Sequence, residues 1–120
     1  MGSINRVFLV GNLGNDPETK QLESGKPLTT FRMATTESWN DKTTGERVED
    51  TQWHRIVSFG KTAELAAQYL NKGRRIWVEG RLKTRKWQDT EGKDRYMTEI
   101  VADGITFLDK RNAESAEVAS

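Results

Sequence analysis

One segment of the chain, KTAELAAQYLNKG at residues 61–73, repeats its apolar residues at the spacing of an α-helix. Ala63, Ala66, Ala67 and Leu70 recur so that all four share one helical face. The other apolar runs alternate with polar residues or are rich in β-branched residues, which is typical of strands. A chain with a single helix among strands must build its core from a sheet, so the position of the helix limits the possible folds.

The ends of this helix are predicted from its flanking residues. Thr62 can cap the N-terminal end, and Glu64 suits the positive first turn. Lys72 and Gly73 suit the C-terminal end, where a cation and a left-handed residue are both favourable. We therefore expect the helix to span residues 61–73.

Five strand-like runs accompany the helix. Three precede it and two follow it, at residues 6–14, 28–39, 51–60, 74–87 and 95–108, with the last run forming one strand or two. Residues 15–27 are rich in turn formers and predict a loop or a short ribbon. This order matches the OB-fold, an all-β, five-stranded Greek-key barrel with one helix between strands 3 and 4. Hairpin meanders of other barrels share much of the order, and the position of the helix favours the OB-fold.

A length of 120 residues suits one domain with one core. We expect the OB-fold domain to occupy residues 1–108. Residues 109–120 lack apolar periodicity and are expected to form a flexible tail, which either ends here naturally or has been trimmed from a longer one. The absence of cysteine excludes disulfides and thiolate metal sites. No apolar run approaches the roughly 20 residues of a membrane span, and the N-terminus lacks a secretory signal pattern. These features predict a soluble protein of the cytoplasm.

Charge is balanced over the whole chain but uneven along it. Lys and Arg number 19 and Asp and Glu number 18, so the net charge of +1 indicates no particular partner. Residues 72–95, however, hold nine Lys and Arg against four Asp and Glu, a local charge of +5. Residues 37–50 hold two against five, a local charge of −3. One end of the fold is therefore expected to bind an anion.

Aromatic residues accompany these cations. Alternation along a strand places Trp87 on the same face as Arg81, Lys83 and Arg85, and that face is too charged for a core. In the strand at residues 51–60, Trp53 and Phe59 lie on either side of Arg55 on one face, and Trp39 ends another strand before a polar loop.

Exposed rings beside cations suit an unpaired polynucleotide, because every base can stack on an aromatic face while the cations neutralise its phosphate. A duplex hides its base faces, so such a surface is expected to select single strands with little base preference. Core packing of any one ring, or a protein interface, stays open as the alternative. Trp77 is assigned to packing or an interface, because it lies between Ile76 and Val78 and close to Gly80, where a bulge is expected.

Catalytic motifs are not found. The chain has one histidine, no cysteine, and none of the nucleophile-elbow, phosphate-loop or zinc-protease patterns. His54 therefore receives a structural role, either packed in the interior or at a subunit contact. We expect no enzyme activity, no metal and no cofactor, and a carboxylate pair assembled by the fold is the remaining catalytic alternative.

Several long motifs, in order, resemble the bacterial single-stranded DNA-binding protein family. They are NRVFLVGNLGNDPE, ATTESWNDKTTGE, TQWHRIVSFGKTAELAAQYLNKG and VEGRLKTRKWQDTEGKDRYMTEIV, which together span about residues 4–108. The resemblance implies an OB-fold, a homotetramer, and sequence-tolerant coating of single-stranded DNA in replication, recombination and repair, without catalysis, cofactor or metal. It also implies a histidine near the subunit contact, which corresponds to His54.

The resemblance further implies two sets of DNA-binding residues. The stacking rings correspond to Trp39, Trp53, Phe59 and Trp87. The phosphate-contacting cations correspond to Arg6, Lys20, Lys42, Arg55, Lys61, Lys72, Lys83, Arg85 and Lys86.

The chain departs from the family pattern at its end. Family members usually continue through a Gly/Pro/Gln-rich linker to an acidic tip that recruits replication and repair proteins, whereas this sequence ends in AESAEVAS. Such recruitment is therefore expected only if the full-length protein carries that tip. Two other functions stay open: an OB-fold module for replication restart or RNA binding, and an interaction barrel whose rings form a protein interface.

Overall fold

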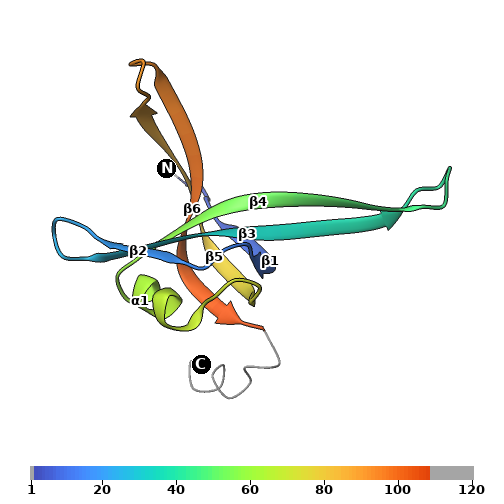
Figure 1. Cartoon of the computed structure of the whole chain (residues 1–120), viewed down its shortest axis with the longest axis horizontal. Helices are drawn as coiled ribbons and strands as arrows, with labels where there is room; N and C mark the ends of the chain where they lie inside the picture. The colour runs from blue at the N-terminus through green and yellow to red at the C-terminus, as the bar shows by residue number, and fades with distance from the viewer. Residues whose placement is uncertain (1, 109–120) are drawn as a thin grey trace.

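Six strands and one helix make up residues 2–108, the part of the chain that this computed structural model describes (Figure 1). In chain order they are β1 (Val7–Leu13), β2 (Glu18–Gln21), β3 (Pro27–Asn40), β4 (Arg47–Phe59), α1 (Gly60–Tyr69), β5 (Arg75–Gln88) and β6 (Asp94–Phe107). All five predicted strands are present, the last run forms one strand, and the short ribbon is β2. The tail expected at residues 109–120 lies outside the described part. No helix in residues 2–108 is long and apolar enough to cross a membrane.

A closed barrel results from the strand order β1-β5-β6-β4-β3-β2 together with an additional pairing between β1 and β3. The β4–β6 pair is parallel, and the other pairs are antiparallel. β2 pairs with β3 alone and stands outside the closed ring. The ring therefore contains β1, β3, β4, β5 and β6, with α1 between its third and fourth strands, as the sequence predicts.

Two hairpins extend from the barrel and point away from it in different directions (Figure 1). β3 and β4 remain paired as far as Asn40 and Arg47, and β5 and β6 as far as Gln88 and Asp94. In their barrel halves β3 and β5 alternate buried and less buried residues, and β4 and β6 hold runs of consecutive buried residues, whereas the outer halves of all four strands are almost entirely exposed. We call these outer halves the β3–β4 arm and the β5–β6 arm.

The core lies inside the barrel and under the helix. Its buried residues alternate along the strands, as expected for a sheet with one inward face, and they are Leu13, Phe31, Met33, Ile56, Ile76, Val78, Ile100, Ala102 and Phe107, joined from the helix side by Ala66 and Leu70. The small side chains of Ala63 and Ala66 allow α1 to approach β3 and β4 closely. The buried hydroxyl of Thr29 donates a hydrogen bond of 2.9 Å to the carbonyl of Ala63, which fixes the helix against β3.

The predicted ends of the helix are wrong. The helix begins at Gly60, whose φ of +62° lets β4 turn directly into α1, so Thr62 lies inside the first turn and no side chain caps the start. Glu64 lies beyond the first turn, and no basic residue lies in the last one. The helix ends at Tyr69, so Lys72 belongs to the loop that follows.

The bulge expected at Gly80 is present, because the β5–β6 register shifts between Glu79 and Gly80. Gly80 is buried, and a Cβ placed there would collide with the carbonyl oxygen of Val101 and lie 2.9 Å from its carbonyl carbon. The obstacle is backbone, which cannot move aside as a flexible side chain can. Gly104 on the neighbouring strand differs, since its Cβ would meet only the Cβ of Glu79 at 3.8 Å.

We predict that Gly80→Ala lowers the free energy of unfolding by about 1–3 kcal/mol, the usual cost of overpacking a well-packed site. Gly104→Ala is the matched control and should change it by less than about 0.5 kcal/mol. Urea unfolding followed by circular dichroism measures both values. Equal losses in the two variants would contradict the close backbone approach at Gly80.

Candidate nucleic-acid interface

One face of the barrel gathers cationic and aromatic side chains from several strands. On β4, alternation places Trp53, Arg55 and Phe59 together, as the sequence predicts. The regular β5–β6 register keeps Lys83, Arg85 and Trp87 on one face of the β5–β6 arm. We call this surface the cationic face. It comprises Lys20 from β2, Trp53, Arg55 and Phe59 from β4, and Lys83, Arg85 and Trp87 from β5.

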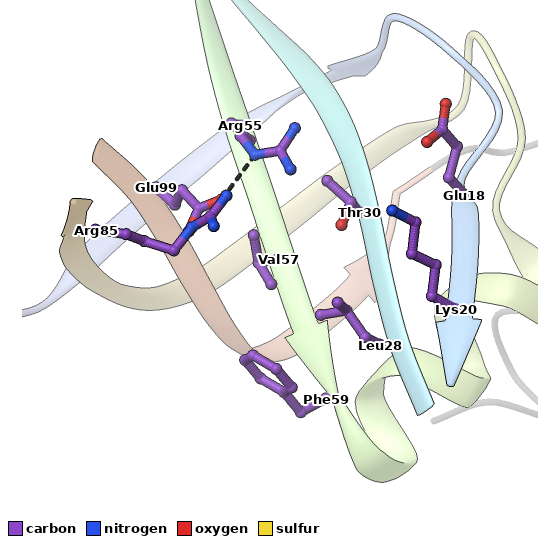
Figure 2. A pocket seen from close by; sticks show the side chains of 9 residues that line it. All are labelled: Glu18, Lys20, Leu28, Thr30, Arg55, Val57, Phe59, Arg85 and Glu99. Atoms are coloured by element: carbon purple, nitrogen blue, oxygen red, sulfur yellow. Dashed lines mark hydrogen bonds and ion pairs between the residues drawn. The ribbon is translucent and has the colours of Figure 1, made fainter. Parts of the chain in front are cut away.

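A pocket of about 270 Å³ lies in the cationic face (Figure 2). Its lining residues come from five strands and are Glu18, Lys20, Leu28, Thr30, Arg55, Val57, Phe59, Arg85 and Glu99. Figure 2 shows the Phe59 ring at one end and the guanidinium groups of Arg55 and Arg85 at the other, with Val57 and Leu28 between them and Lys20 across the opening. The pocket thus offers an aromatic end and a cationic end.

Glu99 holds the cationic end together, and the sequence analysis missed it. Its side chain is 5% exposed, and its carboxylate accepts a hydrogen bond of 2.7 Å from Arg55 Nε and one of 2.9 Å from Arg85 Nε. Burial would raise the pKa of Glu99, but the hydrogen bonds and charges of the two arginines outweigh burial and hold the pKa below its ordinary value. The sequence analysis made no prediction for Glu99, because the pairing of β6 with both β4 and β5 was not available from the sequence.

The Trp53 ring is half exposed, at 52%. It packs against Gly14, where any side chain would collide with the ring. The guanidinium of Arg32 lies 4.7 Å from the ring centroid, at the distance of a cation–π contact. Arg32 is a second residue that the sequence analysis missed, because it neighbours Trp53 across the β3–β4 pair rather than along the chain.

Trp39 and Trp87 lie on the two arms, away from the pocket. Trp39 is 48% exposed and pairs with Val48, and alternation puts it on the opposite face of the β3–β4 arm from Trp53. Trp87 is 43% exposed and pairs with Arg95 near the tip of the other arm. All four predicted stacking rings are therefore accessible, but only Phe59 lines the pocket.

The remaining predicted cations are dispersed. Arg6, before β1, bonds to Asp103 at 2.8 Å, and that hydrogen bond raises the pKa of Arg6 and lowers that of Asp103. Lys86 lies on the opposite face of its arm from Arg85 and pairs with Asp94 at 3.2 Å. The others are exposed at the tip of the β3–β4 arm, in α1 and in the loop after it: Lys42, Lys61 and Lys72. Their contact with phosphate stays a prediction.

His54 lies on the opposite face of β4 from Arg55. It is half-buried, and its Nε2 lies 2.9 Å from the Thr35 hydroxyl. Burial lowers its pKa, because the charged ring loses hydration. Within residues 2–108, no group of three or more His, Asp or Glu side chains is arranged to hold a metal ion. The placement of His54 fits a structural role, and its role at a subunit contact stays a prediction.

A closed five-stranded barrel with one helix between its third and fourth strands, carrying an exposed face of rings and cations, defines an OB-fold binding protein. Residues 4–108 match the single-strand binding protein family, and the chain belongs to that family. Among solved structures, a Plasmodium falciparum SSB complex with ssDNA is 38% identical to this chain, with a TM-score of 0.82. The match covers 91% of this chain and 98% of that one.

The lowered pKa of His54 predicts a pH dependence of stability. A group whose pKa is lower in the folded state contributes stability above its unfolded pKa, about 6.5 for histidine, and that stability is lost as the pH falls through the folded pKa. The free energy of unfolding should therefore fall between about pH 7.5 and about pH 5.5. His54→Gln, which cannot titrate, should show a smaller fall when urea unfolding is measured at both pH values. An identical fall in both proteins would contradict the assignment.

Proposed function

We propose that this protein binds and coats single-stranded DNA with little sequence preference, by stacking bases on exposed rings and neutralising phosphates with Lys and Arg. Family membership supports single-stranded DNA as the ligand. The observation that carries the residue-level proposal is the cationic face, where Phe59 shares a pocket with Arg55 and Arg85, and where Trp53 and Trp87 remain accessible.

Stacking and charge have separate roles in this mechanism. A ring binds the face of any base, so stacking is tolerant of sequence and requires an unpaired strand. The cations bind phosphates, which every nucleotide carries, and this contribution falls as salt rises. The pocket is walled mainly by a ring, aliphatic groups and cations, with the hydroxyl of Thr30 and the carboxylates of Glu18 and Glu99 as further polar groups. Asn and Gln side chains, which read base edges, do not line it.

The biological setting is proposed from the family resemblance. We place the protein in the bacterial cytoplasm, associated with the nucleoid, where it would protect exposed strands during DNA replication, recombination and repair. It would act by binding and without catalysis, and its membership of the single-strand binding protein family supports this role. Recruitment of replication and repair proteins would require an acidic tip in the full-length protein.

A homotetramer is also part of the proposal. Phe8, Val10 and Trp77 are all exposed on the outer side of the barrel, and Val10 pairs directly with Trp77 across β1 and β5. Three large apolar side chains beside one another are unusual on a surface that faces only water. We propose that this apolar patch is covered by another copy of the chain. Trp77 is exposed in this structure, so it is not buried in the core of its own chain.

We predict that Trp53→Ala and Trp87→Ala each weaken binding of an oligo(dT) strand by about 1–3 kcal/mol, the usual value of one base stacked on an aromatic ring. Anisotropy of labelled oligo(dT) measures the affinity without depending on protein fluorescence. Tyr96→Ala is the control, because Tyr96 is exposed on the same arm but on the opposite face from Trp87. Unchanged affinity in both tryptophan variants would contradict the stacking assignment.

The same titration separates this function from an interaction barrel. Binding of oligo(dT) by the parent protein should quench tryptophan fluorescence, and it should weaken with a log–log salt slope of roughly −0.7 for each phosphate neutralised. An interaction barrel would show no salt-sensitive quench. A strong preference for RNA over DNA of the same sequence would favour the RNA-binding alternative.

The proposed tetramer is tested by Trp77→Glu. A buried, unpaired carboxylate would oppose burial of the apolar patch, so we predict that sedimentation equilibrium gives the mass of four chains for the parent and a smaller assembly for the variant. Tyr96→Ala removes an exposed ring outside the patch and should keep the parent mass. Circular dichroism checks that Trp77→Glu is folded, and an unchanged mass in a folded variant would contradict the assignment.

A further inference from the structure

Glu99 has no role in the stacking and charge mechanism described above, although it lies within the cationic face. Its side chain is 5% exposed, whereas the side chains of Arg55 and Arg85 are 39% and 50% exposed. A carboxylate placed here would weaken the binding of a polyanion if it acted through its charge alone. Its burial between two exposed cations therefore indicates a different role.

The geometry shows what the carboxylate does to its neighbours. β6 pairs with β4 on one side and β5 on the other, so Glu99 reaches an arginine on each strand. Its Oε2 accepts from Arg55 Nε at 2.7 Å, its Oε1 accepts from Arg85 Nε at 2.9 Å, and Arg85 Nη2 approaches Oε2 at 3.3 Å. Both guanidinium groups thus present their inner edge to the same carboxylate (Figure 2).

The outer edges of these guanidinium groups are left for a ligand. In the hydrogen bonds formed among residues 2–108, neither Nη1 nor Nη2 of Arg55 takes part, nor does Nη1 of Arg85. These nitrogens border the open pocket whose other end is the Phe59 ring. Guanidinium nitrogens bind phosphate oxygens in a fixed, planar geometry, so their orientation decides whether both arginines can reach one phosphate.

Two guanidinium groups held side by side repel each other, and each loses rotamer freedom when it is ordered. The shared carboxylate offsets the repulsion and orders both side chains before a ligand arrives, which reduces the ordering cost of binding. Burial alone would raise the pKa of Glu99, so its lowered pKa agrees with this geometry, in which the two guanidinium groups stabilise the charged carboxylate.

We propose that Glu99 is a positioning residue, which orients Arg55 and Arg85 so that their outer nitrogens bind one backbone phosphate of the strand at the cationic end of the pocket. This inference rests on the proposed function. In this role an acidic residue favours the binding of a polyanion. Removing the charge of Glu99 should therefore weaken DNA binding, whereas charge alone predicts that it strengthens DNA binding.

The test is Glu99→Gln, which keeps the size of the side chain and removes its charge. We expect the affinity for oligo(dT) to fall roughly tenfold, the value of one hydrogen bond to a charged group, and the log–log salt slope to lose about 0.7. Charge alone predicts tighter binding, because one negative charge leaves the surface. Tighter or unchanged binding by a folded Glu99→Gln protein would overturn the proposal.

Two matched controls accompany this variant. Glu18 also lines the pocket, but its carboxylate forms no ion pair with any residue in 2–108. The Glu18→Gln variant should therefore bind oligo(dT) at least as tightly as the parent protein. Arg95→Lys makes the same change as Arg85→Lys on the same arm, but Arg95 bonds to Asp89 at 3.0 Å instead of Glu99. A loss in Glu18→Gln equal to that in Glu99→Gln would overturn the proposal.

A double-mutant cycle shows whether Glu99 acts through Arg85. We expect Arg85→Lys, which keeps the charge, to lower the affinity roughly tenfold in the parent and much less in the Glu99→Gln background. Equal losses in both backgrounds would overturn the coupling. If Glu99→Gln does not fold, a loss in Arg85→Lys that is absent in Arg95→Lys supports the proposal, and equal effects overturn it. Failure of the parent protein to bind oligo(dT) would instead overturn the proposed function.

Discussion

The pairing of β1 with β3 closes the barrel, and the rest of the structure depends on it. β1 pairs along one edge with β5 and meets β3 on the other through Asn12 and Leu13. At Gly11 the two backbones come so close that a Cβ would collide with the carbonyl oxygen of Ala34. Only glycine permits this approach, so one residue type at one position allows the sheet to become a ring without open edges in its wall.

Closure also determines how the four long strands are used. Inside the ring, inward residues such as Phe31, Met33 and Ile76 are completely buried, and the core needs no contribution from the outer halves of the strands. The arms are therefore free of the demand to bury apolar surface. This explains how a chain that is only 34% apolar can leave Trp39, Trp53 and Trp87 accessible and still form a core.

Much of the fold could be predicted from the sequence, because alternation and the single change of period are local properties. They located five strands, one helix, the bulge at Gly80, and the shared face of Arg55 and Phe59. The start of the helix was missed because a positive φ at Gly60 turns the chain two residues before Thr62, and capping rules do not include that geometry.

The candidate site was predicted less completely, because contacts between strands depend on register. Glu99 contacts both Arg55 and Arg85 because β6 lies between β4 and β5 in the sheet. Arg32 contacts Trp53 because the two residues are neighbours across the β3–β4 pair. Residues of one strand that alternation separates, such as Arg85 and Lys86, do lie on opposite faces. The family resemblance implies that both residues contact phosphate. A DNA strand that reaches both must therefore pass around the β5–β6 arm rather than along one side of it.

The uneven charge of the two arms limits the path of such a strand. Residues 81–99, which form the β5–β6 arm, hold six Lys and Arg against four Asp and Glu, a net charge of +2, whereas residues 37–50 of the β3–β4 arm carry a local charge of −3. Phosphates should therefore follow the barrel face and the β5–β6 arm, where Lys83 and Arg85 lie. Trp39, on the acidic arm, can contribute to binding only if the base turns toward its ring while the phosphate stays in solvent or near Lys42. In the proposed mode of binding, stacking and phosphate neutralisation are joined in the pocket and separated on the β3–β4 arm, so binding to that arm should depend least on salt.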